Sequence, residues 1–387
     1  MDWLILLALN RIYQSPILLP IYKLLKLILR LSTGTSEIYR ICRATAKELG
    51  YTDADLAFYE SDAYAINALD EGDTLDDDTQ PLLATTPLLA DIQRPILAQD
   101  IPEDVIYRID RCILYSKQLS LERRDLESPF CHLDQVLSAI LSKKQFPHQA
   151  SPKSAPAQVL RACLLRIAKT YQLAHEINER TQVKYDSTNP LHEQKLLKLW
   201  EALMPDTQLE ARLTQQWGEI GFQGNDPATD FRGMGMQGLD DLLYYAQTHA
   251  ASAQSTFSSS RHPVSWYPYA IVGINITHFA VHTLRTRQLQ HFLFKYGADR
   301  KTYSEFYCYL YHQFNEFWIS HEQPRLTVMD FERKFQEFKR QVQDDLMFRR
   351  VQPLTQLLNT RLDDEKNVEL QTQNETNHLT HRHVASS

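Results

Sequence analysis

Apolar residues recur every three or four positions along most of this chain, which is the spacing of α-helices. No long segment shows the strict alternation of apolar and polar residues that half-buried β-strands require. The sequence therefore predicts an all-α fold, with a multi-helix domain and an N-terminal helical extension. The repeat is well developed between residues 158 and 182. Its apolar positions there are Leu160, Leu164, Ile167, Tyr171 and Ile177.

Local signals mark where two of these helices begin. Asn189 followed by Pro190 is typical of an N-cap with proline at the first helical position, and it predicts a helix to Leu203. Thr207 and Glu210 have capping-box spacing, which predicts the start of a further helix. The apolar positions of that further helix would be Leu209, Leu213, Trp217 and Ile220.

The C-terminal half continues with helical patterns. Leu239 to Ala246 predicts a helix in which Asp240 and Asp241 lie near the N-terminus and favour its dipole. Residues 251–263 are expected to form a loop. From Pro268 the chain is apolar nearly all round, which indicates a buried central helix. Aromatic residues then follow at helical spacing, and such a stripe is more often core than a cofactor platform. They are Phe306, Tyr307, Phe314, Phe317 and Trp318, and a last helix is expected over 327–348.

Residues 1–31 are the most apolar part of the chain, but prolines and charges interrupt them before they could span a bilayer. From Pro20 the pattern predicts an amphipathic helix with Lys23, Lys26 and Arg30 on one face. Such a helix is suited to an anionic membrane surface. Packing of this helix against the protein's own core is the equally good alternative.

Changes in composition divide the chain into segments. An acidic cluster followed by a stretch interrupted by prolines indicates disorder, as does the polar C-terminal tail. A second stretch rich in proline, serine and alanine indicates a linker and a domain boundary. The expected segments are N-terminal amphipathic helices (1–49), an acidic disordered insertion (50–101), a helical extension (102–142), a linker (143–157), the main helical domain (158–350) and a disordered tail (351–387).

Composition excludes some classes of function. The chain has 387 residues and a formal net charge of −7, so it lacks the overall positive charge expected of a nucleic-acid-binding protein. Its five cysteines are widely spaced, without zinc-binding intervals, and reduced thiols in a cytosolic compartment are expected. No P-loop motif occurs, so the chain is not itself expected to be a P-loop GTPase or ATPase.

Glycine is concentrated in one place. Six of the 11 glycines lie between Gly218 and Gly238, where they flank the turn signal Asn225-Asp226-Pro227. Because clustered glycine costs backbone entropy, an ordered irregular segment is expected there, of the kind that displays a functional group. The formal GxGxxG match at Gly233 lacks a preceding strand and a following acid, so it does not indicate a dinucleotide site.

The glycine-rich segment carries one arginine, Arg232. From residue chemistry alone, its guanidinium could form an ion pair with Asp230 or Asp226 and hold the segment together. It could instead be presented to an anion outside the protein. The residues by themselves favour the first interpretation slightly.

The same segment resembles the sequence signature of the ELMO (engulfment and cell motility) domain in the short ELMOD proteins. Residues 29–42, 196–205, 269–277 and 306–318 also resemble that family, and the similarity covers 20–49 and 102–345. Gln237 departs from the pattern, which favours leucine there. The signature positions are Trp217, Ile220, Gly221, Phe222, Gln223, Pro227, Thr229, Asp230, Arg232, Gly233 and Gly235, with Gly238 closing the segment.

The resemblance implies a GTPase-activating protein for Arf and Arf-like small GTPases, in which Arg232 is supplied in trans to the partner's nucleotide. Asp230 would hold Arg232, and the glycines would allow close approach. Trp217, Ile220 and Phe222 would anchor the segment to the core, and Gln223 could contact the partner. The chain would then need no cofactor of its own, because GTP and Mg²⁺ belong to the partner. A cytoplasmic location, peripheral on endomembranes through residues 1–31, is expected.

Two other functions remain open from the sequence. Larger ELMO-domain proteins act as non-catalytic adaptors in Rac signalling and phagocytosis, although this chain has no armadillo-type repeat array. The chain could also be a lipid-surface protein in which the ELMO domain is only a core. Because an activator of a partner's hydrolysis has no substrate pocket of its own, whether the chain counts as an enzyme stays open.

Overall fold

The computed structural model describes residues 8, 11–13, 15–51, 96–147, 154–321, 325–363 and 366. Across these ranges the chain is helical and contains no β-strand, which confirms the all-α prediction. The acidic cluster and the last residues of the tail, with their histidines, lie outside the described residues. The disorder expected for them stays a prediction.

The chain divides into two compact units, Met1–Gln172 and Leu173–Ser387. The division lies inside one long helix, α8 (Ala155–Gln182), and not in the linker expected at 143–157. Residues 154–157 of that expected linker already belong to the start of α8 or precede it directly, and Ala155 and Ala157 are buried.

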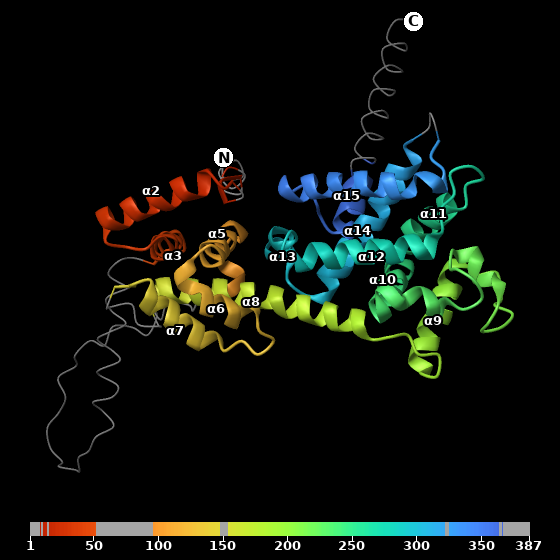
Figure 1. Cartoon of the computed structure of the whole chain (residues 1–387), viewed down its shortest axis with the longest axis horizontal. Coiled ribbons are helices and arrows are strands. Elements are labelled where there is room, and N and C mark those ends of the chain that lie inside the picture. The colour runs from red at the N-terminus through yellow and green to blue at the C-terminus, as the bar shows by residue number, and fades with distance from the viewer. Residues whose placement is uncertain are drawn as a thin grey trace, which may run out of the picture. The chain divides into compact units, whose positions relative to one another are not determined.

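The first unit is built from short helices (Figure 1). Helix α3 packs on α5, and α6 packs on α5 and α7. Residues 96–101, expected to be disordered, are instead ordered here, because Ile101 is buried and the amide of Ile96 donates to Gln158. The elements are α2 (Leu18–Thr33), α3 (Glu37–Glu48), η2 (Ala98–Asp100), α5 (Glu103–Leu114), η3 (Lys117–Leu119), α6 (Ser120–Glu127) and α7 (Leu133–Lys143), followed by α8.

Helix α2 is the amphipathic helix predicted from Pro20 onwards, and its apolar face does not pack against the core. The membrane contact expected for it stays a prediction. The partly buried stripe of α2 consists of Leu19, Tyr22, Lys26 and Arg30. Lys26 and Arg30 therefore face the rest of the unit, whereas the leucine and isoleucine side chains of the helix are largely exposed. The helix neither buries its apolar face in the core nor presents its full basic face to solvent.

The second unit surrounds α10, which contacts α9, α11, α12 and α14. Helix α12 is buried as predicted, and the aromatic stripe of α14 forms core, where Phe306, Tyr307, Phe314 and Trp318 are each fully buried. The elements, drawn in Figure 1, are α9 (Pro190–Leu203), η4 (Gln215–Ile220), η5 (Pro227–Gly233), α10 (Gly235–Thr248), α11 (Ala250–Ser260), α12 (Tyr269–Arg285), α13 (Gln290–Tyr296), α14 (Arg300–Ile319), η6 (Val328–Asp330) and α15 (Phe331–Met347).

The helix predicted from Thr207 does not form. Residues 207–214 are irregular, and only the short 3-10 helix η4 follows, capped by Thr214. Two buried tryptophans explain this: Trp200 Nε1 donates to the carbonyl of Thr207 at 2.7 Å, and Trp217 Nε1 donates to that of Arg212 at 2.9 Å. These carbonyls are thereby committed to side chains and not to a helical ladder.

In two other places a helix forms where the sequence predicted none. Residues 251–263 were expected to be a loop, but α11 forms over most of them and buries Ala253, Thr256, Phe257 and Ser260. These four residues have helical spacing, yet most are small or polar, so the apolar pattern is weak. The tail was expected to be disordered from 351, but residues 354–363 are helical and Leu354 is fully buried in the core.

Candidate functional site

The glycine-rich segment forms two 3-10 helices joined by a turn, between α9 and α10. In the second of these helices, η5, Pro227 stands at the first position and the Asp226 side chain accepts a hydrogen bond from the amide of Ala228. Thr229 Oγ1 donates to the carbonyl of Asp226 at 3.2 Å. Arg232 is therefore carried on a short capped helix, and not on an open loop.

Aromatic packing anchors this segment to the core, as expected from the sequence. Trp217 and Ile220 are fully buried, and Phe222 is 5% exposed. The rings of Phe222 and Phe231 meet edge to face with centroids 5.4 Å apart, and Trp217 meets Trp200 in the same way at 5.5 Å. Edge-to-face pairs add to the free energy gained by burial, so the base of the segment is rigid.

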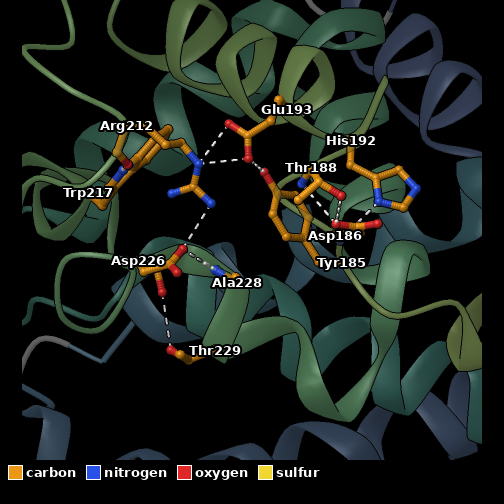
Figure 2. A network of polar contacts seen from close by, with 10 residues as sticks. All are labelled: Tyr185, Asp186, Thr188, His192, Glu193, Arg212, Trp217, Asp226, Ala228 and Thr229. Carbon is orange, nitrogen blue, oxygen red and sulfur yellow. Dashed lines mark hydrogen bonds and ion pairs between the residues drawn. The ribbon is translucent and has the colours of Figure 1, made fainter. Parts of the chain in front are cut away.

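A second arginine, which the sequence analysis did not single out, ties the segment together. Arg212 donates from Nε to Glu193 at 2.7 Å and from Nη2 to Asp226 at 2.9 Å. Tyr185 donates its hydroxyl to Glu193 as well, so α9 and the turns before η4 and η5 are joined by one network (Figure 2). The pairing partners lie 19 and 14 positions from Arg212, and no local sequence pattern reveals such a contact.

Arg232 makes a much smaller set of contacts. Its side chain is exposed, and its Nε donates to the carbonyl of Thr229, one turn back, at 3.0 Å. Within the described part of the chain it forms no ion pair. Both carboxylates proposed as its partners are engaged elsewhere: Asp226 with Arg212, and Asp230 with the amide of Gln223 at 2.7 Å.

Asp230 nevertheless lies close enough to Arg232 to interact with it electrostatically. Burial raises the pKa of Asp230 above its usual value, while the Gln223 amide and the Arg232 charge oppose that shift. The carboxylate therefore fixes the backbone at Gln223, and the positive charge of Arg232 is not neutralised by a direct ion pair. The side chain of Gln223 is exposed on the same segment.

Two of the glycines are needed for backbone reasons. Gly221 has φ +85°, and a Cβ there would lie 2.3 Å from the amide nitrogen of Tyr269. Gly235, which begins α10, has φ +51°, and a Cβ there would lie 2.5 Å from the carbonyl oxygens of both Thr181 and Val183. Gly233 differs from both, because the space around it is open.

Behind the glycine-rich segment, a series of hydrogen bonds connects three polar side chains. Arg300 donates to Gln237 Oε1 at 3.5 Å, and Gln237 Nε2 donates to Asp241 Oδ1 at 2.7 Å. Burial raises the pKa of Asp241 to about 8. Helix α10 begins at Gly235, so Asp240 and Asp241 are not in its first turn as expected. Asp240 instead pairs with Arg180 and Lys195.

The described residues offer no group of three or more metal-ligating side chains. All five cysteines are free, in agreement with the expectation of reduced thiols. The residues predicted for the site do come together, but they divide by role. Arg232, Gln223 and Gly233 are exposed, whereas Trp217, Ile220, Phe222, Pro227, Gly235 and Gly238 are buried or close-packed and support them.

Comparisons with known proteins agree with this picture. Residues 175–335 match the model of the ELMO/CED-12 family. The chain is 39% identical to ELMO domain-containing protein 2 of Mus musculus over 236 residues, which are 60% of this chain and 79% of the relative. The chain belongs to the ELMO/CED-12 family. It is also 34% identical to ELMO domain-containing protein B of Dictyostelium discoideum over 239 residues, 62% of this chain and 83% of the relative.

The ELMO match encloses the whole candidate site. It begins within α8 and ends within α15, so it contains Arg212, Arg232 and the partners of both. A similar relationship holds for ELMO domain-containing protein 1 of Bos taurus, which is 38% identical over 230 residues, 54% of this chain and 69% of the relative. The whole of the first unit lies outside the family match.

Proposed function

We propose that this ELMO protein is a GTPase-activating protein for an Arf or Arf-like small GTPase, and that Arg232 acts in trans on the bound GTP. The observation that carries the proposal is the exposed guanidinium of Arg232, whose hydrogen bond goes to a carbonyl of its own turn and not to a carboxylate. In addition, the structural role open to Arg232 from the sequence is performed by Arg212.

The physical chemistry of GTP hydrolysis explains why such an arginine would act. Negative charge on the transferring phosphoryl group is stabilised in the transition state by a guanidinium, and an arginine supplied in trans raises the rate by about 10³–10⁵-fold. The planar fork of arginine matches two phosphate oxygens at once, which the ammonium of lysine cannot do. GTP and Mg²⁺ would be bound by the partner, and the ELMO chain would contribute Arg232 and its rigid support.

The rigid support matters because an arginine supplied in trans must reach the partner's nucleotide without a large loss of conformational entropy. Phe231, the residue before Arg232, is 1% exposed and packs on Tyr185 and Phe222. Asp226 caps the same 3-10 helix and is itself fixed by Arg212. The backbone of Arg232 is thus held in place while its side chain is exposed, with one hydrogen bond to the carbonyl of Thr229.

The test is single-turnover GTP hydrolysis by a panel of Arf and Arf-like proteins, with wild-type chain, Arg232→Ala and Arg232→Lys. Arg285→Ala is a matched control, because Arg285 is also exposed and lies on α12 of the same unit. We expect stimulation by the wild type and the control, and almost none by either Arg232 variant. Stimulation that survives Arg232→Ala would exclude the arginine-finger role. GTPase binding without stimulation by the wild type would favour the adaptor function.

We also propose that residues 1–31 bring the protein to the cytoplasmic side of Arf-bearing membranes as a peripheral protein. None of the described helices is both long enough and apolar enough to cross a bilayer. The supporting observation is the exposed apolar face of α2. Flotation of the full chain with lipid vesicles tests the contact. A chain that stays with the soluble fraction for every vesicle composition would contradict it.

A further inference from the structure

A cavity of about 640 Å³ lies in the first unit, beside the inner face of α2. Residues of α2, α3, α5 and η3 line it, together with Tyr13 and Lys144. The cavity lies apart from the Arg232 segment in the sequence and has no part in the proposed GTPase activation. Its lining is strongly cationic. The basic residues are Lys23, Lys26, Arg30, Arg111, Lys117 and Lys144.

Among the described residues that line this cavity, Glu37 is the one carboxylate, and its hydrogen-bonding capacity is largely used. Glu37 accepts from Lys26 at 2.6 Å, from the hydroxyl of Tyr22 at 3.1 Å and from the thiol of Cys112 at 3.2 Å. It therefore neutralises one lysine, and none of the other described residues that line the cavity carries a negative charge.

Two of the other cations, Arg30 and Lys144, are bound to neutral oxygens. Arg30 Nη2 donates to Gln145 Oε1 at 2.7 Å, and Lys144 Nζ donates to Ser116 and Gln118 at 2.9 and 3.0 Å. These hydrogen bonds satisfy donors but cancel no charge. Arg111 lies over the ring of Tyr107, and its buried Nε has no hydrogen-bond partner within the described ranges.

The pKa of Lys144, one of the basic residues that line the cavity, reflects the crowding of positive charge there. Burial and the neighbouring Arg30 lower the pKa of Lys144 below its usual value. An anion bound between Arg30 and Lys144 would reverse this effect, since opposite charge favours the protonated amine. The cavity is therefore arranged to gain from a polyanionic ligand, although the whole chain carries a net negative charge.

The same helix that lines the cavity also presents apolar side chains outwards. From Ile17 to Leu31 the leucine and isoleucine side chains, Leu19 apart, are between 46% and 77% exposed. A soluble anion would account for the cations but not for this apolar face. A membrane lipid offers hydrocarbon and a phosphate headgroup at one interface, and so matches both features of α2.

We propose that the cavity binds the phosphate headgroup of an anionic membrane lipid while the outward face of α2 enters the bilayer surface. This inference rests on the membrane contact proposed above and specifies its ligand. Arg30, Lys117 and Lys144 at the cavity would contact the headgroup. Leu25 and Ile28, each 53% exposed, would contact the acyl chains.

Flotation of the full chain tests the inference with vesicles of phosphatidylcholine alone and of phosphatidylcholine containing phosphatidylinositol 4-phosphate. We expect the second vesicles to bind the chain more tightly, and Lys117→Gln/Lys144→Gln to reduce that binding about tenfold or more. Arg124→Gln/Lys169→Gln is the matched control, because it removes equal charge from exposed positions of the same unit. Circular dichroism must show that each variant is folded.

Two further arms separate the sources of affinity. Leu25→Glu/Ile28→Glu is expected to abolish flotation and to leave calorimetric binding of soluble inositol 1,4-bisphosphate unchanged. Equal flotation of wild type, cavity variant and control on both vesicles would overturn the headgroup site but keep the membrane contact. Absence of both flotation and headgroup binding would contradict both proposals. Binding of the soluble headgroup without any flotation would mean that the ligand is a free phosphate and not a lipid.

Discussion

Arg212 and Asp226 are joined by a hydrogen-bonded ion pair of 2.9 Å that links the turn before η4 to the cap of η5. This pair leaves Asp226 unavailable to Arg232, six residues further along the chain. One arginine thus holds the segment in place, and the other remains exposed upon it. The two arginines should therefore respond to substitution in different ways.

For Arg212→Ala, we expect the free energy of unfolding to fall by about 1–3 kcal/mol, because a partly buried charged hydrogen-bond network is lost. For Arg232→Ala the change should stay within about 0.5 kcal/mol, as is usual for an exposed residue. Urea denaturation followed by circular dichroism measures both. Equal destabilisation by the two substitutions would contradict the division of roles.

Gly235→Ala should destabilise the chain, whereas Gly233→Ala should not. A left-handed backbone costs an alanine about 1–2 kcal/mol, and at Gly235 the new methyl group would also meet two carbonyl oxygens. Gly233 has open space around it and serves as the matched control. Urea denaturation gives the comparison, and an undiminished stability of Gly235→Ala would show that the start of α10 can adjust.

Asp241 should make stability depend on pH. The pKa is raised from 3.8 to about 8, so between these values the folded chain keeps a proton that the unfolded chain releases. Stability is then greatest at the acid end of this window and falls as the pH rises, by at most about 1.4 kcal/mol per pH unit. In Asp241→Asn this contribution should disappear. Unfolding measured from pH 5 to pH 8 checks it, and parallel curves for the two proteins would refute it.

The helical residues 354–363 should contribute to the core. Leu354 is fully buried, so Leu354→Ala is expected to cost about 2–5 kcal/mol through lost burial and a residual cavity. Leu362, on the same helical stretch, is 51% exposed, and Leu362→Ala should have little effect. Thermal or urea unfolding distinguishes them. A Leu354→Ala chain as stable as the control would mean that this stretch packs weakly.

Elements with local signals could be predicted from the sequence. Asn189 and Pro190 predict the start of α9, and the Asn189 side chain does accept a hydrogen bond from the amide of Leu191. Aromatic residues at helical spacing predict α14 in the same way. By contrast, the Thr207–Glu210 pattern was misleading, because the indole of Trp200, seven positions away, takes the carbonyl that a helix would need.

The sequence was enough to predict which residues belong to the candidate site, but not which ion pairs hold them in place. The glycine-rich pattern and the family signature both led to Arg232. That Arg232 is free of an ion pair among the described residues depends on Arg212, whose partners Glu193 and Asp226 are distant in the sequence. Charge pairing over such separations is decided by tertiary packing, and one sequence cannot reveal it. The orientation of α2 was hidden for the same reason.

The position of α8 has a practical consequence for experiments with fragments of this protein. The family match starts at residue 175, near the end of a helix that began at Ala155. A fragment trimmed to the match would keep only the last residues of α8 and would open that helix at a fully hydrogen-bonded turn. It would also separate Leu173 from Ile177, although both belong to the buried core of the second unit. The bounds of the family match are therefore not positions at which the chain can be cut.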